Sequence, residues 1–107
     1  MRPIPEKMRK EMSEDLYMKK CCLSNSPAVE WHHVWKYAGQ QINEKWAIMP
    51  LSKWYHIGVH SNKEVQEKVQ YLSLLRATEK DLEKYPKKDW KQLFNYLKDK
   101  HGKIING

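Results

Sequence analysis

The sequence predicts a single α+β domain in which a small β-rich centre is followed by helices. Between Lys19 and Leu51, short apolar pieces are interrupted by turn residues, which is typical of short strands. After Leu51, apolar residues recur at helical spacing. The length of 107 residues suffices for one hydrophobic core and is too small for a second independent one. We therefore treat residues 1–107 as one domain.

The N-terminal segment, residues 1–18, is expected to form an arm or helix. Charged positions alternate there with Met8, Met12, Leu16 and Tyr17, which predicts a short helix over residues 5–18.

The central segment, residues 19–62, is expected to hold two or three short strands. Its apolar pieces "CCL", "AVEWHHVW" and "WAIMPL" are separated by the turn sequence "SNSP" and by Gly39.

The C-terminal segment, residues 63–107, is expected to be helical. One face of its first helix would carry four apolar residues: Val65, Val69, Leu72 and Leu75. Ser61 with Glu64, and Thr78 with Asp81, have the spacing of capping boxes. A last helix would start at Asp89, bury residues such as Trp90 and Leu97, and end at Gly102.

Charge and cysteine content limit the function classes. The net charge of +7 divides into +2 for residues 1–20, +1 for 21–60 and +4 for 61–107, so the flanking segments carry the basic surface. Such a surface suits a polyanion such as nucleic acid, although lysine-rich helices also serve solubility alone. The adjacent pair Cys21 and Cys22 excludes a disulfide framework and indicates reduced thiols. With no long apolar run and no apolar leader, the expected location is the cytoplasm, with no membrane partner.

Four histidines fall within a short central stretch of the chain. His32 and His33 are adjacent, and His56 and His60 are four residues apart. Imidazoles spaced i, i+4 on a helix or in a tight turn face one side and can share a metal ion. Adjacent residues in a strand point to opposite faces, so we expect His32 and His33 to have different roles. One would be a ligand and the other a metal-free acid–base group, because an ordinary histidine pKa near ~6.5 allows proton uptake at neutral pH.

These elements resemble a known family, the HNH or ββα-metal endonucleases, which have a small treble-clef-like centre. The piece "EWHHV" is similar to the family's first strand, "WAIMPL" to its second, and "HIGVH" to the helix that brings further histidines. The sequence of the segment "EWHHVWKYAGQQINEKWAIMPL" resembles that of small nucleases encoded by bacteriophages. The likeness covers residues 19–62.

The resemblance implies a role for each site residue. His33 would be the general base that activates water, His32 and His56 would be metal ligands, and His60 a third ligand or a phosphate contact. Asn43 is the nearest candidate for the family's asparagine, which orients the base histidine. One divalent ion is implied, Mg, Mn, Ni or Zn, and an all-imidazole site suits Zn or Ni better than Mg.

Many relatives carry two cysteine pairs around a structural zinc, which this chain is not expected to have. Cys21 or Cys22 and Ser24 occupy the place of the first pair, and Ser52 stands where a cysteine of the second would be. Apolar packing would then hold the centre together, with four tryptophans in it: Trp31, Trp35, Trp46 and Trp54.

The predicted function is that of a phage-encoded, metal-dependent hydrolase that cleaves phosphodiester bonds in DNA. Lys36, Lys53 and Lys63 are the lysines predicted to contact the nucleic acid, through backbone phosphates. A homodimer would be one route to cutting both strands. Two alternatives stay open: a catalytically inactive, metal-stabilised DNA-binding module of a phage recombination or packaging assembly, and a helical interaction protein without metal affinity.

Overall fold

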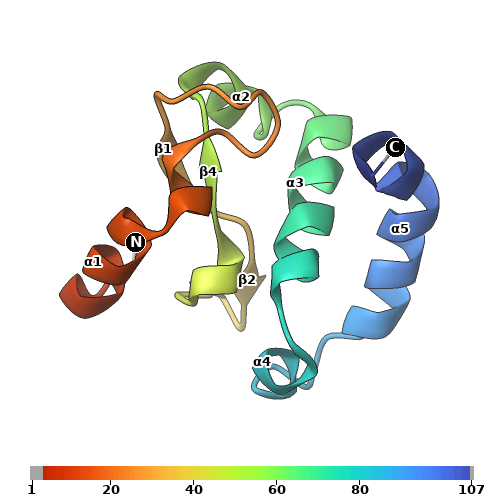
Figure 1. Cartoon of the computed structure of the whole chain (residues 1–107). Helices are drawn as coiled ribbons and strands as arrows, with labels where there is room; N and C mark the ends of the chain where they lie inside the picture. Colours follow the sequence, from red (N-terminus) through yellow and green to blue (C-terminus); the bar gives the residue numbers. More distant parts are fainter. Residues whose placement is uncertain (1–3, 107) are drawn as a thin grey trace.

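An antiparallel pair of strands, β1 (Glu30–His33) and β4 (Ile48–Leu51), lies at the centre of the fold. The computed structural model describes residues 4–106 and arranges helices around this pair and a second small sheet (Figure 1). In the register, His32 lies opposite Met49 and His33 opposite Ile48. Facing residues of an antiparallel pair share a face, so His32 and His33 project from opposite faces of the ladder. The α+β class is confirmed.

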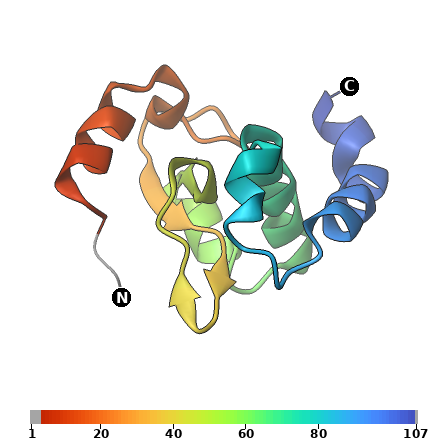
Figure 2. The same cartoon turned by 90° about the horizontal axis from the view of Figure 1, so that it is seen from below.

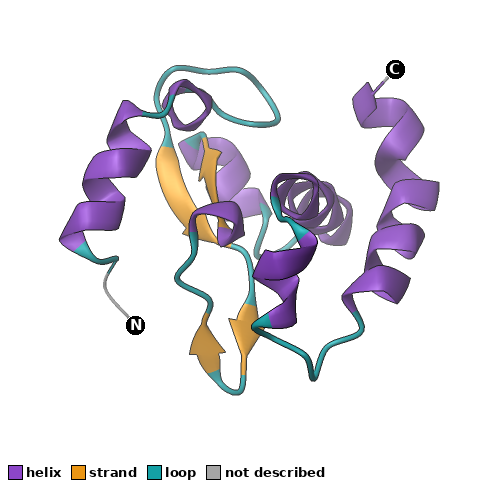
Figure 3. Ribbon diagram, turned by 60° about the horizontal axis from the view of Figure 1, so that its bottom comes forward, coloured by secondary structure: helices purple, strands orange, loops and turns teal. Residues whose placement is uncertain are grey.

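The second sheet is a hairpin of two-residue strands, β2 (Lys36–Tyr37) and β3 (Gln40–Gln41), visible at the lower edge of Figures 2 and 3. Its turn residues, Ala38 and Gly39, have φ angles of 52° and 81°. Positive φ at both central positions is typical of a type I′ turn, which matches the twist of paired strands. Between residues 19 and 62 the structure thus has four short strands rather than the predicted two or three. The two-residue strands β2 and β3 are too short to show an alternation of apolar and polar residues.

One face of the β1–β4 ladder is covered by the N-terminal segment. Helix α1 (Glu6–Glu14) and the 3-10 helix η1 (Leu16–Lys19) pack Met12 and Met18 against Ile48. The predicted N-terminal helix is confirmed, but it divides at Asp15, whose backbone is extended and whose side chain accepts a hydrogen bond from the Tyr17 N–H at 2.9 Å. That bond caps η1.

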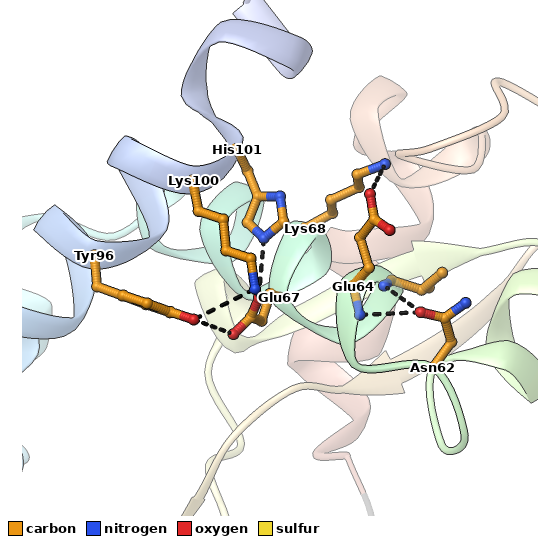
Figure 4. A network of polar contacts seen from close by, with 8 residues as sticks. Asn62, Glu64, Glu67, Lys68, Tyr96, Lys100 and His101 are labelled. Carbon is orange, nitrogen blue, oxygen red and sulfur yellow. Dashed lines mark hydrogen bonds and ion pairs between the residues drawn. The ribbon is translucent and has the colours of Figure 1, made fainter.

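The opposite face is covered by α2 (Lys53–Gly58) and α3 (Lys63–Arg76). Met49 and Leu51 of β4 pack there with Val59 and Val69. The N-cap of α3 is Asn62, whose side chain accepts from the N–H groups of Glu64 and Val65 (Figure 4). The predicted capping box at Ser61 is therefore wrong by one residue. Asparagine is an equally good N-cap and here stands at the residue where the backbone turns into the helix.

Two further helices complete the chain. The capping box of Thr78 and Asp81 is confirmed at the start of α4 (Glu79–Glu83). Helix α5 (Trp90–Asn106) continues through Gly102, so the predicted stop there is wrong. Gly102 is buried where α5 approaches Tyr71, and a Cβ at Gly102 would lie 3.4 Å from the Tyr71 hydroxyl. Packing against α3 therefore keeps this glycine helical.

Helices α3 and α5 lie side by side and are joined by a polar network around Glu67 (Figures 1 and 4). The buried Glu67 carboxylate accepts hydrogen bonds from Tyr96 at 3.0 Å and Lys100 at 2.8 Å, and its Oε1 lies 3.1 Å from Nε2 of the buried His101. Because α3 is packed on two sides, its buried residues do not form a single stripe. Leu75, predicted to lie on the buried face, is 46% exposed.

Aromatic rings fill the space between the hairpin, α3 and α5. Trp35, Trp46 and Trp90 pack edge to face, with ring centroids 5.2 to 5.8 Å apart. The Trp35 indole donates to the Ser73 hydroxyl at 2.9 Å, and Ser73 donates to the Trp46 carbonyl at 2.6 Å. Trp54 is 72% exposed, so its predicted packing role is wrong: α2 turns it to solvent, whereas the sequence-distant Trp90 enters the core.

The three apolar clusters meet along β4. Ile48 packs with α1, Met49 and Leu51 pack with α2 and α3, and Ala47, directly before the strand, belongs to the aromatic cluster. All four residues of β4 are buried. The β1–β4 ladder is thus a fixed support for any side chain that β1 presents.

Candidate metal centre and cleft

Three of the predicted site histidines converge on one point. His32 projects from β1, His56 from α2, and His60 from the turn that follows α2. Their potential ligand nitrogens all lie within 4.8 Å of one another, and their ring centroids are 5.1 to 5.8 Å apart. The three histidines predicted to bind a metal thus form a cluster that could hold one ion.

A carboxylate orients one of these imidazoles. Glu30 Oε1 lies 2.8 Å from Nδ1 of His56. Histidine ligands commonly donate their second ring N–H to a carboxylate, which fixes the tautomer and makes the other nitrogen more basic. His56 is therefore presented with Nε2 free for a ligand. Glu30 begins β1 and lies opposite Leu51, directly before α2, so the strand register places it beside the helix.

His32 is held in the protonation state that a ligand needs. Burial, reinforced by the nearby His56, His60 and His33, lowers the pKa of His32 to about 4. Its imidazole is accordingly neutral at physiological pH, with a lone pair available for a cation.

The geometry fits one transition ion after a small adjustment. With metal–nitrogen bonds of ~2.1 Å, two nitrogens on the same ion lie at most ~4.2 Å apart, and the potential ligand nitrogens, all within 4.8 Å of one another, can reach one ion with a small movement of the side chains. His60 is exposed and lies outside regular helix, which leaves its side chain room to move. Three imidazoles favour Zn or Ni over Mg, which prefers oxygen ligands.

His33 lies next to this cluster but does not belong to it. Its Nε2 is 3.1 Å from Oδ1 of Asn43, a residue of the loop that follows β3. In the tautomer whose Nε2 carries the proton, this bond fixes the ring and leaves Nδ1 with a lone pair. The structure therefore brings together the two residues predicted as base and orienting asparagine.

A cleft of about 830 Å³ connects the two histidine positions. His32 and His33 both line it although they project from opposite faces, because the cleft passes around the free edge of β1. Among the three lysines predicted to contact nucleic acid, Lys36 lines the cleft. Lys53 and Lys63 are exposed at the starts of α2 and α3, outside its lining.

The cleft also contains residues that the sequence did not single out. Arg9 comes from α1, Gln66 and Gln70 come from α3, and Lys88 comes from the segment before α5. Of the residues in the range 4–106 that line it, none is Asp or Glu, whereas Arg9, Lys36 and Lys88 are basic. No local pattern could have identified Lys88, because only the tertiary fold brings it beside β1.

The turn before β1, where the resemblance would place a first zinc-binding cysteine pair, is held by one sulfur, that of Cys21. Cys21 is buried, and its Sγ accepts hydrogen bonds from the backbone N–H groups of Ser24, at 3.4 Å, and Ser52. Burial alone would raise the pKa of Cys21, but these hydrogen bonds outweigh it and lower that pKa. The turn that carries Cys21 is thus fastened to the start of α2 by hydrogen bonds and packing.

Comparison with known proteins adds no relative: no family model, no curated protein and no solved structure matches this chain. Within residues 4–106, no helix has both the length and the apolar character that crossing a bilayer requires.

Proposed function

We propose that this chain is a metal-dependent endonuclease of the HNH type that hydrolyses phosphodiester bonds in DNA. The observation that carries the proposal is the pairing of His33 with Asn43, because His33 lines the same cleft as the cluster of His32, His56 and His60. An oriented base next to a candidate metal position is the minimum that metal-assisted hydrolysis of a phosphodiester needs.

The arrangement of elements supports the same proposal. The β1–β4 ladder followed directly by α2 is the order that the ββα-metal resemblance implies, with histidines at the end of the first strand and on the helix. The surrounding cleft is basic and, in its described lining, free of carboxylates, which suits a phosphate backbone.

Each residue has a distinct task in this scheme. His33 would take a proton from the attacking water at Nδ1, while Asn43 holds the ring in place through Nε2. His32, His56 and His60 would hold one divalent ion, and Glu30 would keep His56 correctly oriented. When bound, such an ion stabilises negative charge that develops on the scissile phosphate and the leaving oxygen.

Nicking of supercoiled plasmid by the purified protein tests this proposal. Reactions with Mg, Mn, Ni or Zn would be compared with an EDTA control and with His33→Ala. We expect metal-dependent nicking by the wild type and a loss of at least about 100-fold in His33→Ala, since general-base catalysis contributes ~10²- to 10⁴-fold.

Equilibrium dialysis against Zn or Ni accompanies this assay, because His33→Ala should still bind the ion. Binding of metal and DNA without any cleavage would replace the nuclease with a DNA-binding module. A wild type without metal affinity would contradict both readings and favour a helical interaction protein. Linear product that forms without prior accumulation of nicked circles would indicate that two copies act together.

A further inference from the structure

Lys88 occupies an unusual position in the cleft. Its ammonium lies 5.7 Å from the ring centroids of both Trp35 and Trp90, which themselves pack edge to face. Cation–π contacts of this kind hold a cation in place without neutralising it. Across the described part of the chain, no carboxylate forms an ion pair with Lys88.

The segment that carries Lys88 is anchored on both sides. The Lys87 N–H donates to the Tyr37 hydroxyl at 2.9 Å, and the Trp90 indole donates to the Tyr85 carbonyl at 2.9 Å. The neighbouring acid, Asp89, is engaged elsewhere, since its Oδ1 accepts from the Gln92 N–H at the start of α5. Lys88 is therefore an exposed, preorganised cation whose charge remains available.

A second cation stands near it. Lys36 lines the same cleft, opposite Gln41 in the hairpin register, and no described carboxylate pairs with it either. Trp35, over which Lys88 lies, connects Lys36 to Val34 and His33 along the chain. We call Lys36 and Lys88 the basic corner.

The spacing suits a strand of nucleic acid. At most ~10 Å of extended chain separates the Cα atoms of His33 and Lys36. One strand of duplex DNA carries a phosphate every ~3.4 Å along the helix axis and winds around that axis, so a separation of ~10 Å corresponds to at most about three nucleotides. A phosphate at the basic corner would thus belong to the same strand as one held near His33, a few nucleotides away.

We infer that Lys88, held over Trp35 and Trp90, is a phosphate-binding residue that positions the DNA strand a few nucleotides from the cleavage site. The inference rests on the proposed function and extends it, because it makes the segment before α5 part of the substrate site. Its consequence is that a polynucleotide is recognised better than an isolated phosphodiester.

DNA binding by Lys88→Gln tests the inference without requiring cleavage. Affinity for a short duplex would be measured in EDTA at several salt concentrations for the wild type, Lys88→Gln, Lys88→Arg and the neighbouring Lys87→Gln, whose side chain does not line the cleft. We expect Lys88→Gln to weaken binding by up to about fivefold, since an exposed ion pair contributes little, and to lower the salt slope by about one ion. Lys88→Arg should restore both values, and Lys87→Gln should match the wild type.

A Lys88→Gln salt slope equal to that of the wild type would overturn the inference, and so would an equal loss in Lys87→Gln. Circular dichroism of each variant separates these results from misfolding. If the wild type cuts no DNA but the Lys88→Gln salt slope falls, the proposed nuclease fails while the phosphate contact stands. If it cuts DNA and the slope is unchanged, only the contact fails.

In an active protein, cleavage adds a second readout. Lys88→Gln should lose more kcat/KM on DNA than on bis(p-nitrophenyl) phosphate, which offers one phosphate only. An equal loss on both substrates would assign Lys88 to the reaction centre instead and would contradict a role at a distant phosphate.

Discussion

Asn43 Oδ1 lies 3.1 Å from Nε2 of His33, although the two are ten positions apart in the chain, with the β2–β3 hairpin between them. The hairpin reverses the chain so that the loop after β3 returns beside the end of β1. This contact gives the candidate base a fixed ring orientation, and it is the relationship on which the catalytic interpretation most depends.

Replacing Asn43 should therefore slow cleavage without removing metal. For Asn43→Ala we expect a nicking rate about 10- to 100-fold below wild type, the range typical of lost orienting partners. Asn95→Ala, at an exposed position of α5, serves as the control and should nick at the wild-type rate. An Asn43→Ala protein with full activity would show that His33 is oriented by something else.

Metal binding should depend on the clustered histidines and not on His33. One ion of Zn or Ni per chain is expected for the wild type and for His33→Ala, whereas His56→Ala should lose most of the affinity, because only two imidazoles remain. Mg should bind more weakly than either. Isothermal titration calorimetry measures all of these, and undiminished binding by His56→Ala would refute the proposed ligand set.

Two substitutions of Glu30 should lower the metal affinity to different extents. Glu30→Gln keeps an acceptor for Nδ1 of His56 but removes the charge, so it should lose less affinity than Glu30→Ala, for which we expect about 10- to 100-fold. Competition with a chelator of known affinity measures both. The exposed Glu14→Gln on α1 should behave as wild type. If the two Glu30 variants were indistinguishable from it, the carboxylate would have no orienting role.

The stability of the protein at low pH should depend on the hydrogen bonds around Glu67. The hydrogen bond from Lys100, helped by His101 and Tyr96, lowers the pKa of Glu67 to about 2, below its usual value near ~4.3 in an unfolded chain. A depressed folded-state pKa adds stability at higher pH, and that stability is lost as pH falls from about 4.5 towards 2. Glu67→Gln should thus be less stable than wild type at pH 7, and the two should converge near pH 2.

Urea unfolding at a series of pH values tests this expectation. The matched control is Glu64→Gln, on the same helix, where an exposed carboxylate pairs with Lys68 at 3.4 Å and should contribute under about 1 kcal/mol. If the free energies of unfolding of wild type and Glu67→Gln changed with pH in parallel, the ionised form of Glu67 would not be stabilised in the folded state.

The sequence predicted those parts of the site that depend on short-range pattern. The i, i+4 spacing predicts that His56 and His60 face one side, the resemblance adds His32 as a ligand, and the structure brings all three together. The predicted capping box of Thr78 is present at the start of α4. It could be predicted because all its residues lie within one helical turn.

What the sequence did not predict depends on tertiary packing. Lys53 and Lys63, two of the predicted phosphate contacts, lie outside the lining of the cleft, whereas the sequence-distant Lys88 lines it. Gly102 is helical because α5 packs on α3 there, and Trp54 is exposed because α2 directs it outward. Residue type alone indicates none of these, since each depends on how the helices pack in the folded chain.

The position of β4 bears on how the protein can be dissected. Three of its four residues, Ile48, Met49 and Leu51, contribute with Ala47 to all three apolar clusters, and two of those clusters need partners from α1 or from α5. A fragment limited to residues 19–62 would keep every clustered histidine and yet leave Ile48 and Trp46 without most of the side chains that cover them. The histidine centre therefore should not survive excision as a minimal module. Denaturation should be one cooperative event in which the two ends of the chain and the centre are lost together.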